Sequence, residues 1–252
     1  ERLGLLGDGG QLRWEVQPPR YRGTPSDVIN VMPADINADG RPEIIAGCRS
    51  WQYFAYDASG KMLWQNVIYA HSASVACADD LDGDRKAEIV AGNVYYTLNV
   101  ISPDGKRRWL GGSIGPEITA VGTWRIPSEK GPRVVAGVDG GMLYAYDAAG
   151  KKLWETHLGD RVTRILSCDV DGDNQPELIC AAESAHVFAL KPDGRILWRS
   201  ALPDGATDML LLPGTGSPRF AVAAGSAGVC LLDASGKIVK TLATSGRARL
   251  LV

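Results

Sequence analysis

The stretch LYAYDAAGKKLW at residues 143–154 decides the fold, because versions of it recur along the chain. Related phrases end at Trp14, Trp64, Trp109 and Trp198, and a further one, DASGKIVK, ends at Lys240. Their spacing of about 45 residues is typical of a repeat architecture. Within each phrase two short runs flank a turn that contains glycine, which is the pattern of a β-hairpin.

Two more apolar runs precede each hairpin and complete the repeat, as in PEIIAG at residues 42–47 and AEIVAG at residues 87–92. No part of the repeat shows a helical period, so we predict four short antiparallel strands per repeat. Four-stranded sheets that recur at this period are the blades of a β-propeller, and each blade covers the faces of its neighbours. We therefore expect an all-β fold, with residues 1–252 forming a single β-propeller domain of about six blades. The recurrent tryptophan is expected to pack between neighbouring blades.

The two ends of the chain continue the pattern. Residues 1–14 resemble the last two strands of a blade, and RARLLV at residues 247–252 resembles a first strand. We predict that these segments together close one blade from both termini, which would remove exposed strand edges.

Composition excludes some partners. A formal net charge of −2 and a pI near 6.0 leave no basic surplus for a phosphate backbone, so nucleic acid is not an expected partner. No apolar run approaches the roughly 20 residues that span a bilayer. The cysteines have no CxxC spacing and lie in apolar runs, which favours buried reduced thiols. A Cys168–Cys180 disulfide is the main alternative among Cys48, Cys77, Cys168, Cys180 and Cys230.

Three repeats place an acidic loop between their first and second strands. Oxygen-bearing side chains stand at loop positions 1, 3, 5 and 9, and a backbone carbonyl at position 7 could add another oxygen. Such a set suits Ca²⁺ better than Mg²⁺ or a transition metal. The alternative is a solvated acidic turn. The predicted ligands are Asp35, Asn37, Asp39, Arg41 and Glu43; Asp80, Asp82, Asp84, Lys86 and Glu88; and Asp169, Asp171, Asp173, Gln175 and Glu177.

These loops resemble those of the FG-GAP and VCBS repeat families, whose blades carry DxDxDGxxD/E calcium loops. This chain departs from that pattern with glutamate at position 9 and with Arg85 in place of glycine in the second loop. LYAYDAAGKKLW also resembles the repeats of quinoprotein-type propellers. In both families the calcium loops brace a blade corner, so the resemblance implies up to three structural calcium ions and no catalytic metal.

The opposite edge of the blades collects aromatic and polar residues. Aromatic rings beside hydrogen-bonding groups suit a carbohydrate, and a protein ligand is also possible on this face. The alternatives are packing between blades for the aromatic rings, loop histidines with satisfied hydrogen bonds, and a salt-bridged rim. The predicted ligand-binding residues are Arg49, Trp51, Tyr69, His71, Tyr95, Arg161, Glu183 and His186.

Three functions are consistent with these patterns. A non-catalytic binding or scaffold propeller is favoured, since no GxSxG, HExxH, Walker or GxGxxG motif occurs in a suitable context. A polysaccharide lyase or hydrolase would need a base such as His71 or His186 beside Arg49 or Arg161. The third is an architectural domain of a longer secreted enzyme. Calcium loops predict an extracellular or periplasmic location, where calcium is plentiful.

Overall fold

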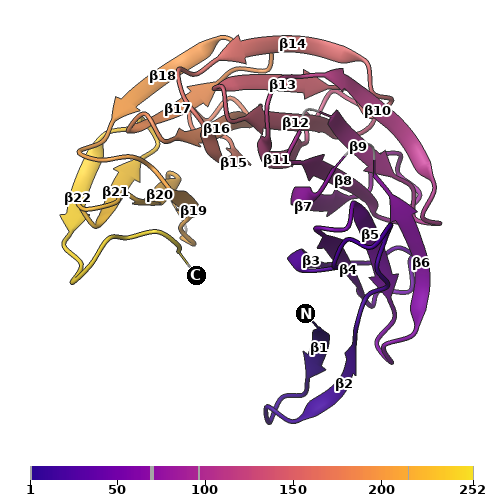
Figure 1. Ribbon diagram of the computed structural model, residues 1–252. Helices are drawn as coiled ribbons and strands as arrows, with labels where there is room; N and C mark the ends of the chain where they lie inside the picture. The colour runs from indigo at the N-terminus through magenta and orange to yellow at the C-terminus, as the bar shows by residue number, and fades with distance from the viewer. Residues whose placement is uncertain (1, 69–70, 96, 215, 252) are drawn as a thin grey trace. The chain divides into compact units, whose positions relative to one another are not determined.

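The protein is all-β in the computed structural model, which describes residues 2–68, 71–95, 97–214 and 216–251 (Figure 1). It forms two compact units, residues 1–121 and 122–252, with the boundary inside β11 (Ile118–Trp124). The described residues form five four-stranded sheets and one two-stranded sheet, and consecutive strands are neighbours in each sheet. The predicted fold class and the predicted four strands per repeat are therefore confirmed for five repeats.

Residues 1–121 contain one short sheet and two complete sheets. The short sheet pairs β1 with β2, and in each complete sheet the fourth strand follows a tight hairpin. The strands are β1 (Leu3–Leu6) and β2 (Leu12–Val16); β3 (Val28–Ala34), β4 (Glu43–Cys48), β5 (Gln52–Tyr56) and β6 (Met62–Val67); and β7 (Ala73–Asp79), β8 (Glu88–Asn93), β9 (Thr97–Ile101) and β10 (Arg107–Ser113).

Residues 122–252 repeat the same order of strands. In the sheet β15–β18 all three strand pairings are antiparallel, as the hairpins require. The strands are β12 (Arg133–Val138), β13 (Met142–Tyr146) and β14 (Lys152–His157), which follow β11; β15 (Val162–Cys168), β16 (Glu177–Ala182), β17 (His186–Leu190) and β18 (Ile196–Ala201); and β19 (Asp208–Leu211), β20 (Arg219–Ala223), β21 (Val229–Asp233) and β22 (Ile238–Leu242).

The segment near the C-terminus forms no strand among its described residues. Ala248 makes an isolated bridge to Gly225, and the backbone N–H of Leu251 donates to Asp208 at 2.9 Å. The sheet that contains β1 has two strands. The closure of one blade from both termini therefore stays a prediction.

Burial follows strand position within each sheet. Every residue of β8, β9 and β16 is buried, which explains why the middle strands read as continuous apolar runs. The fourth strands β6, β14 and β18 alternate between exposed and half-buried residues, because only one face of each is covered. The sheets therefore bury their middle strands and leave their last strands partly in water.

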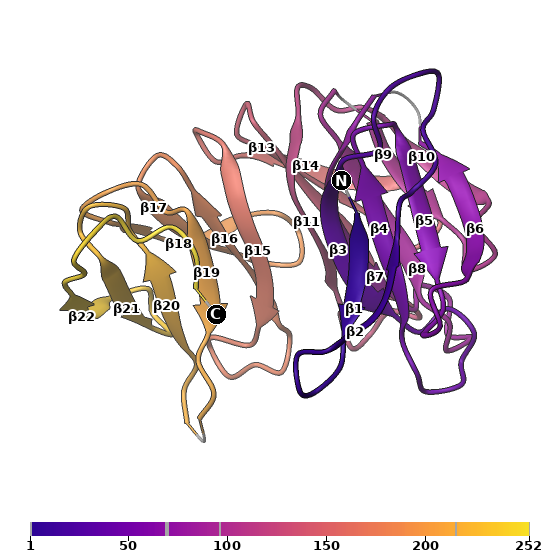
Figure 2. The same ribbon diagram turned by 60° about the horizontal axis from the view of Figure 1, so that its bottom comes forward.

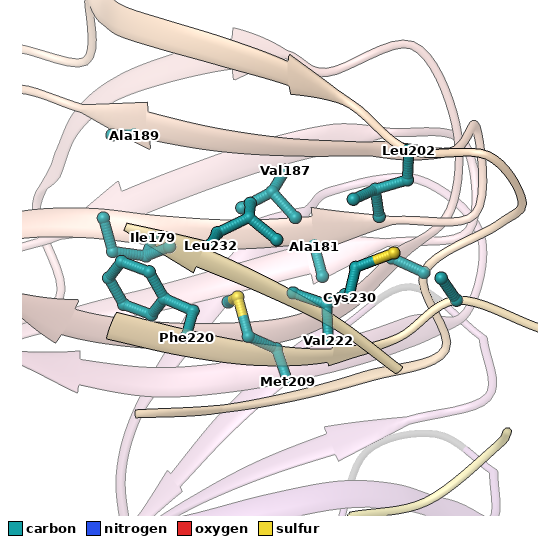
Figure 3. Close-up of a cluster of buried hydrophobic side chains, with 12 residues drawn as sticks. Ile179, Ala181, Val187, Ala189, Leu202, Met209, Phe220, Val222, Cys230 and Leu232 are labelled. Atoms are coloured by element: carbon teal, nitrogen blue, oxygen red, sulfur yellow. The ribbon is translucent and has the colours of Figure 1, made fainter. Parts of the chain in front are cut away.

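Apolar side chains fill the space between neighbouring sheets inside each unit. In residues 122–252, Ile179 and Val187 of one sheet share a buried cluster with Met209, Phe220 and Leu232 of the next (Figure 3). In residues 1–121 a second cluster joins the sheet β3–β6 to the sheet β7–β10. This packing covers sheet faces that would otherwise meet water.

Hydrogen bonds from the indoles of Trp14, Trp64 and Trp154 join one sheet to the hairpin of the next. The Trp64 indole N–H donates to the carbonyl of Pro103 at 2.9 Å. A Cβ atom on Gly105, which has φ of +81°, would lie only 2.6 Å from the Trp64 side chain. The same bond joins Trp14 to Ala58 and Trp154 to Pro192. Glycine is therefore required at this hairpin position for two reasons, because the turn has a positive φ and because a side chain would clash with the indole ring. The predicted packing of the tryptophan between neighbouring blades is confirmed.

The cysteines are free thiols. Cys48, Cys180 and Cys230 are buried, whereas Cys77 and Cys168 are half-buried. Burial raises the pKa of Cys48 and Cys77 to about 12, so both are protonated at neutral pH. The predicted reduced thiols are confirmed, and the alternative disulfide between Cys168 and Cys180 is not formed. Among the described residues, no helix has the length and apolarity needed to span a bilayer.

The loops of each four-stranded sheet emerge at the two ends of its strands, and each of these ends is called an edge here. Loops from the first to the second strand and from the third to the fourth share one edge, here called the acidic edge. Loops from the second to the third strand, and connections to the next sheet, lie at the other edge, here called the ligand edge. In Figure 2 these loops emerge at the two ends of the strands of residues 1–121.

Candidate functional site

The three acidic loops share one backbone shape. Asp35 accepts the N–H groups of Ala38 at 2.7 Å and Gly40 at 2.8 Å. The corresponding carboxylates of Asp80 and Asp169 accept the same two N–H groups of their loops. The residue at position 6 has a positive φ in all three loops, of 81° at Gly40, 70° at Arg85 and 61° at Asn174. Partial desolvation raises the pKa of Asp35, but the backbone hydrogen bonds outweigh it and lower the pKa overall.

The glutamate at position 9 is buried in all three loops. Glu43, Glu88 and Glu177 are 6%, 1% and 0% exposed, and each begins the second strand of its sheet. Oε2 of each accepts the backbone N–H of the residue at loop position 2, at distances from 2.9 to 3.1 Å. One carboxylate oxygen therefore fixes the loop to the strand, and the other faces the centre of the loop.

The second oxygen of each buried glutamate also has a donor. Glu43 Oε1 accepts the Asn37 side-chain amide at 2.9 Å. Glu88 Oε1 accepts Arg108 at 2.7 Å, and Glu177 Oε1 accepts the Lys191 ammonium at 3.0 Å. These donors lie where a metal ion would meet the carboxylates.

Two of the loops contain a carboxylate cluster that could hold a metal ion. Oxygens of Asp80, Asp82 and Glu88 lie within 4.8 Å of one another, as do oxygens of Asp169, Asp171 and Glu177. The first loop has an amide, Asn37, where the others have the second aspartate. The position-7 residues Arg41, Lys86 and Gln175 donate their N–H groups to the position-5 aspartates, at 2.7 to 2.8 Å. Their carbonyls as metal ligands stay a prediction.

A basic side chain lies inside each of these two clusters. Lys191 Nζ contacts Asp171 at 2.5 Å and Asp173 at 3.3 Å, besides Glu177. Arg108 contacts Asp82 at 2.8 Å, besides Glu88. The hydrogen bond to Asp171 raises the pKa of Lys191 and lowers that of Asp171, so both groups are charged. Neither basic residue was predicted from the sequence to be part of a loop.

At the ligand edge of residues 1–121, predicted residues come together with one that was not predicted. Tyr21, Trp51, His71 and Tyr95, here called the aromatic cluster, come from four different connections between strands. Ring centroids lie 6.2 Å apart for Tyr21 and Trp51, 5.0 Å for Trp51 and His71, and 4.5 Å for His71 and Tyr95. Tyr95 is 48% exposed. The cluster is therefore a continuous row of rings that reaches solvent.

Trp51 has an unusual backbone for its residue type. Its φ is +65°, in the left-handed region that costs a non-glycine residue roughly 1 kcal/mol. The carbonyl of Trp51 accepts the backbone N–H of Ile68, which extends the pairing of β5 with β6 by one hydrogen bond. In the sheet β11–β14 the same bond is made by Gly141. A bulky aromatic residue thus occupies a turn position that suits glycine, and His71 also has a positive φ of 88°.

The remaining predicted ligand residues make polar contacts of their own. Arg49 lies 3.5 Å from Asp27. Arg161 pairs with Asp139 and lies 3.8 Å from Glu183, and the His186 ring N–H at Nδ1 donates to Ser184. Arg161 and Glu183 thus form the ion-paired rim considered as an alternative. Tyr69 lies outside the described residues. Ligand binding by any of these residues stays a prediction.

Solved structures show the same fold at low sequence identity. Over 98% of this chain and 76% of the other, the structure of BBS1N in complex with ARL6DN, soaked with mercury, aligns with 13% identity and a TM-score of 0.72. Sqt1 from Saccharomyces cerevisiae aligns over 88% of this chain and 63% of its own, with 13% identity and a TM-score of 0.71. At such identities the likeness shows the fold alone. No curated protein sequence matches the chain.

A match to a family extends over most of the repeats. Residues 91–250 match the family described as outer membrane protein assembly factor BamB. This match supports the predicted β-propeller repeat, and it does not extend to the FG-GAP and VCBS resemblance of the acidic loops. By its strand order and by this match, the chain belongs to the β-propeller repeat family described as outer membrane protein assembly factor BamB.

Proposed function

We propose that this propeller is a non-catalytic scaffold that binds a protein partner through the aromatic cluster. The observation that carries the proposal is Trp51, which holds a large ring in a left-handed turn and contacts the His71 ring. Backbone strain of this kind persists at sites where it serves binding. A group of aromatic rings in contact is a frequent centre of protein interfaces.

The charges around the cluster suggest the chemistry of the partner. Arg22 lies 5.3 Å from the Tyr21 ring centroid, and the Arg49 side chain is 60% exposed. One acidic residue, Asp27, pairs with Arg49. We infer that the partner presents an acidic segment with apolar side chains, whose carboxylates meet the arginines while its apolar groups cover the rings. The structure of BBS1N, which has a similar fold, has been solved in complex with ARL6DN.

The test is selection of binding peptides from a random displayed library. We expect enrichment of segments that combine Asp or Glu with aromatic or aliphatic residues, and binding should fall at least tenfold in Trp51→Gly and Tyr95→Ser. Leu153→Ser, at an exposed position of β14, is the matched control and should bind as the wild type does. Failure to enrich such segments, or equal loss in the control, would contradict the proposal.

Two parallel assays separate the other functions. Binding to a glycan array that is lost in Trp51→Gly would replace the protein partner with the predicted carbohydrate. Release of unsaturated products from uronic-acid polymers would show a lyase, with His71 or His186 as its candidate base.

The remaining structural predictions belong to the same proposal. We propose one propeller of about six blades over residues 1–252, with the sheet β1–β2 completed by residues 247–251. The repeat pattern and the two-stranded sheet support this arrangement. An extracellular or periplasmic location is consistent with a family described by an outer membrane assembly factor.

Calcium is also proposed, and the contacts within the loops favour one site. In the part of the chain that the structure describes, the carboxylates of Asp35, Asp39 and Glu43 form no ion pair with a basic side chain. Rotation of the Asn37 amide would turn its oxygen toward an ion and release Glu43 Oε1. The first loop therefore fits the predicted structural calcium better than the two loops that hold Arg108 and Lys191.

A further inference from the structure

The second and third acidic loops differ from the first in having a cation of their own. In the third loop one ammonium group, Lys191 Nζ, lies within 3.3 Å of carboxylate oxygens from loop positions 3, 5 and 9. In the second loop one guanidinium group, Arg108, lies within 2.8 Å of oxygens from positions 3 and 9. These carboxylates are the ones from which a calcium ion would draw its ligands.

The strand registers explain how each cation reaches its loop. Leu178 pairs with Leu190, so the residues just beyond that pair, Glu177 and Lys191, are neighbours across the strands. Arg108 instead sits in a bulge of β10, between Arg107 and Trp109. A bulge turns one side chain away from the regular alternation, which directs Arg108 toward the loop. Two different positions in the repeat thus deliver one positive charge each.

The first repeat lacks a cation at both of these positions. Asp57 and Leu63 stand there, since Ile44 pairs with Tyr56 and the bulge of β6 falls between Met62 and Trp64. The same repeat also lacks the carboxylate at loop position 3, where Asn37 replaces aspartate. Loops with four carboxylates therefore have one cation, and the loop with three has an amide donor. The formal charge summed over these carboxylates and the added cation is the same in all three loops.

We propose that Arg108 and Lys191 are resident cations that replace calcium in the second and third acidic loops, respectively. A tethered cation competes with free calcium at a high effective concentration, and it is already in place when the sheet folds. The ion pairs also satisfy the inward oxygens of Glu88 and Glu177, which burial would otherwise leave without a partner. These two corners are therefore braced in the absence of any metal, and the second and third loops are calcium-independent despite their calcium-binding sequence.

The test is the number of calcium ions bound, measured by calorimetric titration of the full chain with calcium chloride. Lys191→Met keeps the length of the side chain and removes the charge, so we expect it to bind one more calcium ion than the wild type. Lys191→Met combined with Asp171→Asn should lose that added ion. Lys191→Arg should bind as the wild type does. Lys152→Met, which removes an exposed lysine paired with Glu155, is the matched control and should add no ion.

A second variant decides the question if Lys191→Met does not fold. Asp171→Asn alone, in the wild-type background, should leave the number of bound calcium ions unchanged, because the third loop holds none. Loss of one bound ion in Asp171→Asn would overturn the proposal. A Lys191→Met variant that folds and binds no more calcium than the wild type would overturn it as well. Calcium binding that disappears only in Asp39→Asn concerns the first loop and supports the distinction between the loops.

Discussion

Within residues 1–121 the two edges of the sheets use their side chains in opposite ways. At the acidic edge the buried carboxylate of the second loop is saturated with hydrogen bonds from within its own sheet, since Glu88 accepts from Leu81 and Arg108. At the ligand edge aromatic rings remain partly in water, and Trp51 keeps a positive φ. The acidic edge therefore stabilises the folded state, whereas the positive φ at the ligand edge destabilises it.

The difference indicates where binding is to be sought. The polar groups of a saturated loop are already satisfied, so an added ligand gains little by meeting them. Exposed aromatic rings still have apolar surface to bury, and burial of such rings drives association. We therefore expect substitutions at the acidic edge to change stability and substitutions at the ligand edge to change binding.

The largest expected effect is at the buried glutamate of the third loop. Glu177→Leu leaves the Val170 N–H without its acceptor and removes one partner of Lys191, so it should lower the free energy of unfolding by about 3 kcal/mol. Urea unfolding of each variant would measure it. Glu183→Leu, at the ligand edge of the same sheet and 50% exposed, should change stability by less than about 0.5 kcal/mol. Similar losses in both variants would break the comparison.

A smaller loss is expected at the hairpin glycines of the acidic edge. The Cβ of Gly194→Ala would lie 2.7 Å from the Trp154 ring, and φ there is +84°. We expect a loss of about 2 kcal/mol, measured by thermal and urea unfolding. The matched control is Gly10→Ala, at a hairpin glycine with φ of +77° whose Cβ would have no atom within 4 Å. If the control were as unstable as Gly194→Ala, the loss of stability would not come from the contact with the indole ring.

A smaller change in stability than at the hairpin glycines is expected for Trp51 at the ligand edge. Trp51→Gly loses the ring contacts with Tyr21 and His71 but relieves the strain of the left-handed backbone. Its free energy of unfolding should therefore stay within about 1 kcal/mol of the wild-type value. Trp51→Ala keeps the strain and loses the ring, and it should be less stable than Trp51→Gly. If Trp51→Gly were as destabilising as Glu177→Leu, the ring would serve packing, and the contrast between the edges would fail.

The fold was predictable because the signals for the turns and strands of each repeat lie within short segments of the sequence. The glycine turns, the apolar runs of the middle strands and the recurrent tryptophan all appear in the sequence at a constant spacing. The loops around Asp35, Asp80 and Asp169 were also predictable, since one short segment supplies most of each loop.

The contents of the loops were harder to predict, because Lys191 and Arg108 arrive from other strands. One signal was present, the charges of the cross-strand neighbours. In the sheet β19–β22, which has no acidic loop, Arg219 at the start of the second strand faces Asp233. In the sheet with the third loop the charges at these two positions are reversed, with Glu177 facing Lys191. Tyr21 was missed because it lies in an irregular connection between sheets, where no repeat position predicts its neighbours.

The link from Trp14, Trp64 and Trp154 to the next hairpin has a consequence for the copy number of the repeat. One sheet supplies the indole, and its successor supplies the glycine turn that receives it, as Trp154 and Gly194 do. Excision of one whole repeat would bring together an indole and a turn of the same kinds as before. The number of blades in such a chain can therefore change by duplication or deletion without the design of a new junction.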